Sequence, residues 1–116
     1  ILVIQVKRFL KNQYFTEKNP SLVMLPLDQI IDMKNVDPTN PVTLGAEVSQ
    51  KYRLIGIITH EGDVNKGMYK SYVCVSHNEG GPEGRWMELQ DLYTREIHPS
   101  VACTSPAYLL MFQKLH

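Results

Sequence analysis

Apolar residues along this chain gather in short runs separated by polar turns, a pattern typical of β-strands rather than long helices. The clearest run covers residues 52–60, where three isoleucines and a leucine can fill both faces of a strand. Further strands are predicted over residues 1–9, 14–16, 22–27, 68–76, 85–89 and 107–112. Little room is left for helix, so the pattern predicts an α+β or mainly β fold.

Prolines and glycines mark two segments between these strands. Residues 34–50 contain Pro38, Pro41 and Gly45 among polar residues, and we predict the longest, most variable loop there. Residues 78–84 contain three glycines and a proline, which predicts a turn joining the strands on either side.

Composition limits the functions available to the chain. Its 116 residues suit one domain, and 12 basic residues balance 12 acidic ones, so nothing draws it overall to nucleic acid or membrane. Direct RNA contact and membrane insertion are therefore not expected. Two cysteines do not make a disulfide framework, which favours a reducing compartment. The chain starts without Met inside a predicted strand, so we expect residues to be missing upstream.

Three stretches together resemble one protein family. Residues 2–9 read Leu-Val-Ile-Gln-Val-Lys-Arg-Phe, residues 52–72 contain Gly-Met-Tyr after an apolar strand, and residues 86–110 contain Trp-Met-Glu-Leu-Gln-Asp before Ala-Tyr-Leu-Leu. Their order and spacing resemble the ubiquitin-specific protease family. The resemblance implies an α+β, mainly antiparallel β fold: the C-terminal, palm-like half of a papain-like domain. Residues 1–116 would then be a partial domain whose N-terminal half is absent.

The same resemblance places two residues at catalytic positions. Met68 stands where the family has its histidine, and Gln90 where it has the orienting aspartate. A thioether cannot carry a proton at neutral pH, and an amide cannot stabilise an imidazolium by charge. Asp91 follows Gln90, but successive strand residues face opposite ways. We therefore expect no enzyme, no cofactor and no metal, with the nucleophile outside the chain and Met68 packed in a core.

A narrower resemblance concerns residues 7–20 and 86–92, which look like the catalytically inactive branch associated with the splicing tri-snRNP. It implies a nuclear scaffold in pre-mRNA splicing, with tri-snRNP proteins as partners. Two alternatives stay open. The chain could be a fragment of a genuine deubiquitinase, or a pseudoenzyme that still binds ubiquitin.

Other chemistry in the chain is less favoured. Cys74 has His77 three residues later, an offset that puts strand side chains on opposite faces and argues against a nucleophile and base. Cys74, His77, His98 and Cys103 only superficially resemble a zinc site. His60 is interpreted as a polar strand end that meets water, matching a non-catalytic histidine common in the family.

Aromatic and basic residues near the start of the chain are candidates for a protein-binding surface, because such surfaces concentrate aromatic and arginine anchors. We expect Phe9 and Phe15 to pack under the sheet, and Arg8 and Tyr14 to be the exposed interaction residues.

Overall fold

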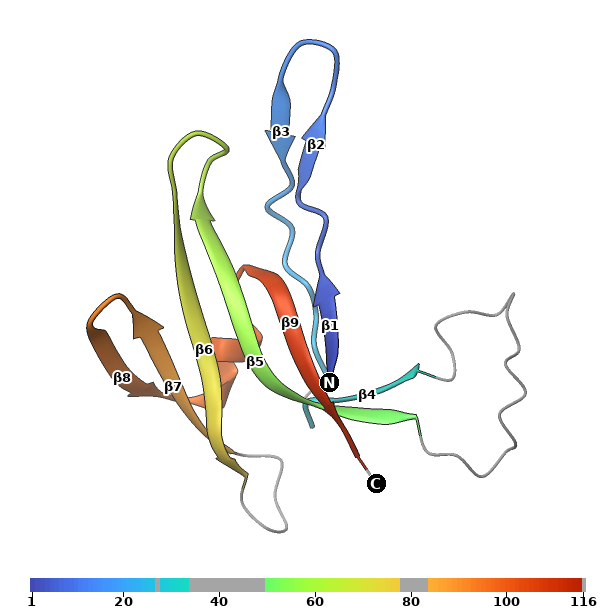
Figure 1. Ribbon diagram of the computed structural model, residues 1–116, viewed down its shortest axis with the longest axis vertical. Coiled ribbons are helices and arrows are strands. Elements are labelled where there is room, and N and C mark those ends of the chain that lie inside the picture. The colour runs from blue at the N-terminus through green and yellow to red at the C-terminus, as the bar shows by residue number, and fades with distance from the viewer. Residues whose placement is uncertain (27, 34–49, 78–83, 116) are drawn as a thin grey trace.

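The computed structural model describes residues 1–26, 28–33, 50–77 and 84–115. Seven strands of this part form one antiparallel sheet, with the order β1-β9-β5-β6-β7-β8 and with β4 paired to β5 (Figure 1). Two short strands, β2 and β3, form a separate hairpin that projects from the sheet as an arm. The elements are β1 (Leu2–Gln5), β2 (Phe9–Lys11), β3 (Thr16–Lys18), β4 (Ile30–Asp32), β5 (Lys51–Gly62), β6 (Gly67–His77), β7 (Gly84–Gln90), β8 (Tyr93–Ile97), α1 (Pro99–Cys103) and β9 (Ala107–Lys114).

Most of the predicted strands are confirmed. The runs at 52–60, 68–76, 85–89 and 107–112 are β5, β6, β7 and β9, each extending slightly beyond the predicted range. The predicted return strand near residue 14 is β3, which pairs with β2 so that Lys11 lies opposite Thr16. The expected α+β, mainly antiparallel class is confirmed. The predicted loop at 34–50, apart from Gln50, and most of the predicted turn at 78–84 lie outside the described residues.

Two predicted strands are wrong, and Arg8 explains both. The run at 1–9 is broken into β1 and β2, because the Arg8 side chain turns inward at the break. Its guanidinium donates to the carbonyl oxygens of Asn19 at 3.0 Å and Ser21 at 2.5 Å. Residues 22–26 have no regular structure. Arg8 holds the carbonyl oxygen of Ser21 just before them, and Pro20 and Pro26 on either side have no N–H to donate to a strand ladder.

Strand β8 and helix α1 were not predicted. Strand β8 is exposed along most of its length, so it has no apolar alternation to detect. Helix α1 is a single short turn with Pro99 near its start. Its N-cap is His98, whose Nδ1 accepts a hydrogen bond from the backbone N–H of Ser100 at 3.2 Å. No helix in the described residues has the length and apolar content needed to cross a membrane.

The core lies where α1 meets the central strands. Trp86 is fully buried and packs with Leu54 and Ile57 of β5 and Tyr72 of β6. Ala102 of α1 closes the cluster, together with Ala107, Leu110 and Phe112 of β9. The strand predicted to be central is therefore central, because β5 pairs with β9 on one side and β6 on the other.

Candidate functional site: the two faces of the β5–β6 hairpin

Met68 lies near the end of the β5–β6 hairpin, directly opposite Glu61. Its side chain is 54% exposed, so the prediction that it packs in a core is wrong. The reason is its place in the fold, since the core ends near Tyr72 and the hairpin continues beyond it. A methionine in this place neither packs nor supplies a base.

Gln90 is the last residue of β7 and pairs with Tyr93 at the start of β8. Asp91 does not follow as a strand residue, as we had assumed. It has a φ of 51°, in the left-handed region, and begins the tight turn into β8. Asp91 is exposed there.

Met68 and Gln90 share one face of the sheet. Strand β6 pairs with β7 so that Tyr72 lies opposite Glu88. Residues two apart on a strand point to the same side. Met68 and Lys70 therefore share the face of Tyr72, and Gln90 shares that of Glu88. Met68 and Gln90 therefore lie on the same face of neighbouring strands, and neither side chain is a base or a carboxylate.

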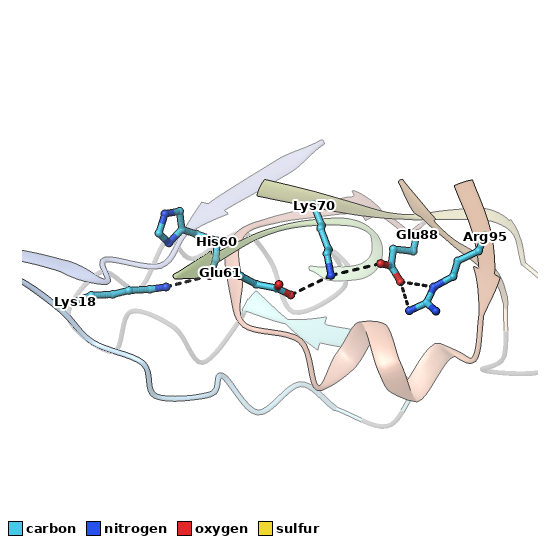
Figure 2. A network of polar contacts seen from close by, with 6 residues as sticks. All are labelled: Lys18, His60, Glu61, Lys70, Glu88 and Arg95. Carbon is cyan, nitrogen blue, oxygen red and sulfur yellow. Dashed lines mark hydrogen bonds and ion pairs between the residues drawn. The ribbon is translucent and has the colours of Figure 1, made fainter. Parts of the chain in front are cut away.

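A chain of charges occupies this polar face instead (Figure 2). Lys70 Nζ lies 3.4 Å from Glu61 Oε1 and 3.6 Å from Glu88 Oε1. On the other side of Glu88, Arg95 Nε and Nη2 each lie 2.8 Å from Oε2. We call Glu61, Lys70, Glu88 and Arg95 the charge network. It joins strands β5, β6, β7 and β8 through side chains of alternating sign.

The charge network is organised around a buried carboxylate. The Glu88 side chain is 4% exposed, and a buried carboxylate is tolerated only when it is paired. Burial disfavours the charge of Lys70, but the carboxylates of Glu61 and Glu88 outweigh this and raise the pKa of its ammonium. Lys70 therefore stays protonated and cannot act as a base. The buried carboxylate of Glu88 is thus held between two cations, Lys70 and Arg95.

The opposite face of the hairpin is aromatic. The His60 ring lies 5.2 Å from Phe9 and 5.1 Å from Tyr69, both edge-on, and Phe9 also meets Tyr108 at 6.0 Å. We call Phe9, His60, Tyr69 and Tyr108 the aromatic cluster. Such edge-to-face contacts add to the stabilisation from burial alone. Phe9 thus packs on the sheet, as expected.

His60 is 5% exposed, so its interpretation as a polar strand end in water is wrong. Its Nδ1 is buried and finds no hydrogen-bond donor or acceptor among the described residues. Burial and the nearby ammonium of Lys18 lower the pKa of this imidazole, with Asp63 opposing them. The ring also explains Gly67, because a Cβ there would lie 1.9 Å from His60 Nε2.

The arm is tied to this hairpin by one lysine. Lys18 of β3 donates from Nζ to the carbonyl oxygen of His60 at 3.1 Å (Figure 2). The same Nζ donates to the carbonyl oxygen of Gly62 at 2.6 Å. Together with Phe9 on His60, this contact fixes the base of the arm against the end of β5.

The two predicted interaction residues have different environments. Arg8 is 1% exposed, and its Nε donates to the carbonyl oxygen of Ala107 at 2.7 Å, so the prediction that it is a surface residue is wrong. An arginine can be buried when backbone carbonyls surround its guanidinium. Tyr14, at the tip of the arm, is 85% exposed, and Phe15 beside it is exposed too, contrary to expectation.

Cys74 lies on β6 and Cys103 at the end of α1, and both pack against the core. Burial raises the pKa of the Cys74 thiol, which donates to the carbonyl oxygen of Ser76 at 3.4 Å. Burial likewise raises the pKa of Cys103. Both are therefore thiols at neutral pH and poor nucleophiles. Within the described part of the chain, no three His, Cys, Asp or Glu residues come together as metal ligands.

Sequence reasoning missed the charge network. Lys70 and Glu88 each lie between apolar or uncharged residues in the middle of a predicted strand, and this was the available signal. Their pairing depends on strand register, and Arg95 depends on β8, which was not predicted. The aromatic cluster was also hidden, because it joins residues from the arm, β5, β6 and β9.

The sequence profile of the ubiquitin carboxyl-terminal hydrolase family matches residues 1–112. The chain therefore belongs to the ubiquitin carboxyl-terminal hydrolase family.

Curated relatives cover nearly the whole chain. Ubiquitin carboxyl-terminal hydrolase 39 of Homo sapiens and that of Mus musculus are each 34% identical over 116 residues, covering 97% of this chain and 19% of the relative. The probable mRNA-splicing protein ubp10 of Schizosaccharomyces pombe is 27% identical over 113 residues, covering 97% of this chain and 22% of the relative. The chain thus spans about a fifth of the length of these relatives.

Solved structures match in the same way. The Ubp8/Sgf11/Sus1/Sgf73 DUB module of SAGA matches with a TM-score of 0.76 and 26% identity, covering 98% of this chain and 24% of the matched chain. A SAGA DUB module containing Ubp8 and bound to monoubiquitin matches with a TM-score of 0.75 and 27% identity. The match covers 98% of this chain and 23% of the matched chain.

Proposed function

We propose that this chain is part of a non-catalytic ubiquitin-protease-like domain that acts as a scaffold in pre-mRNA splicing. The observation that carries the proposal is the polar face of the β5–β6 hairpin. It holds Met68 and Gln90 where the family resemblance expects a histidine and an aspartate.

The chemistry of hydrolysis argues against turnover at this face. A cysteine isopeptidase needs a base near neutral pH to make its thiolate, and an orienting group for that base. Met68 cannot bind a proton, and Gln90 is a neutral amide that cannot stabilise an imidazolium by charge. Glu88 is a carboxylate on the same face, but Lys70 and Arg95 already engage it.

Splicing as the setting is supported by the relatives. One of them is named a probable mRNA-splicing protein, and the match covers 97% of this chain. The narrower resemblance of residues 7–20 and 86–92 adds the tri-snRNP as the assembly concerned. We accordingly place the protein in the nucleus, with tri-snRNP proteins as its partners.

Activity is the first test of the proposal. We expect the full-length protein to release no fluorophore from a ubiquitin C-terminal amide. We also expect residues 1–116 with Met68→His and Gln90→Asp to stay inactive, because the nucleophile is expected to lie outside them. Turnover above the blank that a thiol alkylator abolishes would contradict the proposal and favour a genuine deubiquitinase. A known active family member serves as the positive control for the substrate.

Partner recovery is the second test. Tyr14 is the exposed candidate at the tip of the arm, whereas Arg8 is buried and its substitution would disturb folding. We expect tagged full-length protein to recover tri-snRNP proteins from nuclear extract, and Tyr14→Ala to weaken that recovery. Tyr93→Ala, an exposed tyrosine on β8, is the matched control. Recovery without splicing proteins would contradict the scaffold function.

Ubiquitin binding without hydrolysis is the second candidate. It is favoured by the likeness to a Ubp8-containing module that was solved bound to monoubiquitin. Direct titration of the full-length protein with monoubiquitin separates the two candidates, because a scaffold for splicing proteins alone would give no saturable signal.

A further inference from the structure

The arm formed by β2 and β3 has an exposed face that turns away from the β5–β6 hairpin. Strand pairing places Leu10 opposite Glu17, and Phe15 comes two residues before Glu17. Residues two apart on a strand point to the same side, so these three side chains share one face. Phe9 belongs to the other face of the arm, which rests on the aromatic cluster. We call Leu10, Phe15 and Glu17 the outer arm face.

The outer arm face combines an apolar patch with a charge that has no counterion. Leu10 is 58% exposed and Phe15 is 59% exposed. The two are diagonal neighbours on paired strands, which brings such side chains within reach of one another. Glu17 beside them is exposed, and its carboxylate forms no ion pair with a described residue. Apolar residues bordered by polar ones are typical of surfaces that bind other proteins.

The tip of the arm is fixed before any partner binds. The side-chain oxygen of Asn12 accepts hydrogen bonds from the backbone N–H groups of Tyr14 and Phe15, each at 2.8 Å. The N–H of Asn12 donates in turn to the carbonyl oxygen of Phe15 at 3.0 Å. These bonds close the turn and set the position of Phe15. A residue that is already ordered loses less conformational entropy when it docks.

The base of the arm is fixed as well, although a two-stranded hairpin is only marginally stable by itself in water. The N–H of Asn19 donates to the carbonyl oxygen of Arg8 at 2.6 Å, which joins the two ends of the arm. Lys18 binds the end of the β5–β6 hairpin through the carbonyl oxygens of His60 and Gly62. The arm therefore projects from the sheet and presents its outer face beyond it (Figure 1).

Charge and polarity indicate a separate protein as the occupant. Leu10 and Phe15 need a pocket that removes them from water. The carboxylate of Glu17 beside them then needs a cation, because a charge that loses its water is costly unless it is paired. Proteins that also exist apart keep charged residues at the rim of their interface, whereas the core of one chain seldom encloses an unpaired carboxylate. Glu17 thus favours a partner protein over a further segment of the same polypeptide.

We propose that the outer arm face docks into an apolar pocket of a splicing protein, and that a lysine or arginine at the rim of this pocket pairs with Glu17. The inference rests on the proposed splicing function and adds to it the binding surface and the chemistry of the partner.

Charge reversal on the two faces of the arm is the first test. Lys11 lies opposite Thr16 on the other face and, like Glu17, is exposed and forms no ion pair with a described residue. In the full-length protein, Glu17→Lys should lower the recovery of splicing proteins from nuclear extract by about threefold or more, because like charges then meet. Lys11→Glu is the matched control and should leave recovery unchanged. Thermal unfolding checks that both variants stay folded.

Photocrosslinking identifies the cation on the partner. Benzoylphenylalanine replaces Phe15 in the full-length protein, and the peptides that it crosslinks in nuclear extract are identified by mass spectrometry. We expect a peptide of a splicing protein with a lysine or arginine close to the crosslink. Replacing that cation by glutamate in the partner should restore recovery by the Glu17→Lys variant. Absence of this rescue would overturn the proposal, and so would crosslinks only to ubiquitin or to the protein itself.

The inference and the scaffold function fail in different ways. If the unmutated protein recovers splicing proteins and Glu17→Lys recovers them equally well, the scaffold function stands and the docking surface is wrong. A loss of equal size in Glu17→Lys and Lys11→Glu would also contradict the docking surface, because the two residues lie on opposite faces. If the unmutated protein recovers no splicing protein, the scaffold function is wrong and the inference falls with it.

Discussion

The two faces of the β5–β6 hairpin are built by different physics from alternating residues of the same strands. His60 and Tyr69 point to the aromatic cluster, and their neighbours Glu61 and Lys70 point to the charge network. One face is held by ring contacts, the other by ion pairs around buried Glu88. Neither presents a free base, since His60 is enclosed and Lys70 stays protonated. The two faces of one hairpin are thus stabilised by different interactions, aromatic on one side and ionic on the other.

The first prediction compares truncation of two neighbouring isoleucines that lie on opposite faces of β5. Ile57 is fully buried and packs in the core, while its neighbour Ile58 points to the opposite side and is only half-buried. Ile57→Ala should lower the free energy of unfolding by about 2–4 kcal/mol, from lost burial and the cavity left behind. Ile58→Ala is the control and should cost about half as much. Urea unfolding measures both, and equal costs would mean that the two faces are equally packed.

The second prediction breaks the aromatic face. Gly67→Ala should lower the free energy of unfolding by about 1–3 kcal/mol, because the new methyl group collides with the enclosed His60 ring. In the double variant with His60→Ala the collision is removed, so most of the added cost of the glycine change should disappear. Urea unfolding of the two single variants and the double variant gives the coupling. Additive costs would contradict the contact.

The third prediction breaks the polar face. Glu88→Gln should lower the free energy of unfolding by about 1–2 kcal/mol, because Lys70 and Arg95 lose their shared buried carboxylate but can still reach water. Glu96→Gln is the matched control: its pair with Arg85, at 3.3 Å, is exposed on both sides and should contribute less than about 0.5 kcal/mol. Thermal unfolding at low and high salt compares them. Equal losses would mean that burial of Glu88 adds nothing.

The fourth prediction, with the smallest expected effect, is that the free energy of unfolding depends on pH through His60 of the aromatic cluster. Burial lowers the pKa of His60, so the unfolded chain binds a proton more readily than the folded one. This contribution to stability is fully present above the unfolded pKa of about 6.5 and is lost as the pH falls through that value. Urea unfolding measured across this pH range should show a falling free energy of unfolding in the unmutated protein and a smaller fall in His60→Phe. Identical profiles would exclude His60 as the cause.

The sequence by itself determined four strands whose apolar residues follow a strand pattern: β5, β6, β7 and β9. These strands were enough to indicate the fold class. It also determined what the hairpin lacks, because Met68 and Gln90 have no proton-transfer chemistry wherever they lie. These features depend on residue type and local periodicity, which can be read along the chain.

Only the tertiary structure decided where the polar residues went. Arg8 is buried because carbonyls from Asn19, Ser21 and Ala107 converge on it from segments distant in sequence. Met68 is exposed because the hairpin extends past the core. Glu88 is paired because register places Lys70 and Arg95 on either side of it. Charge placement depends on partners that strand pairing supplies, and strand pairing is a property of the folded chain.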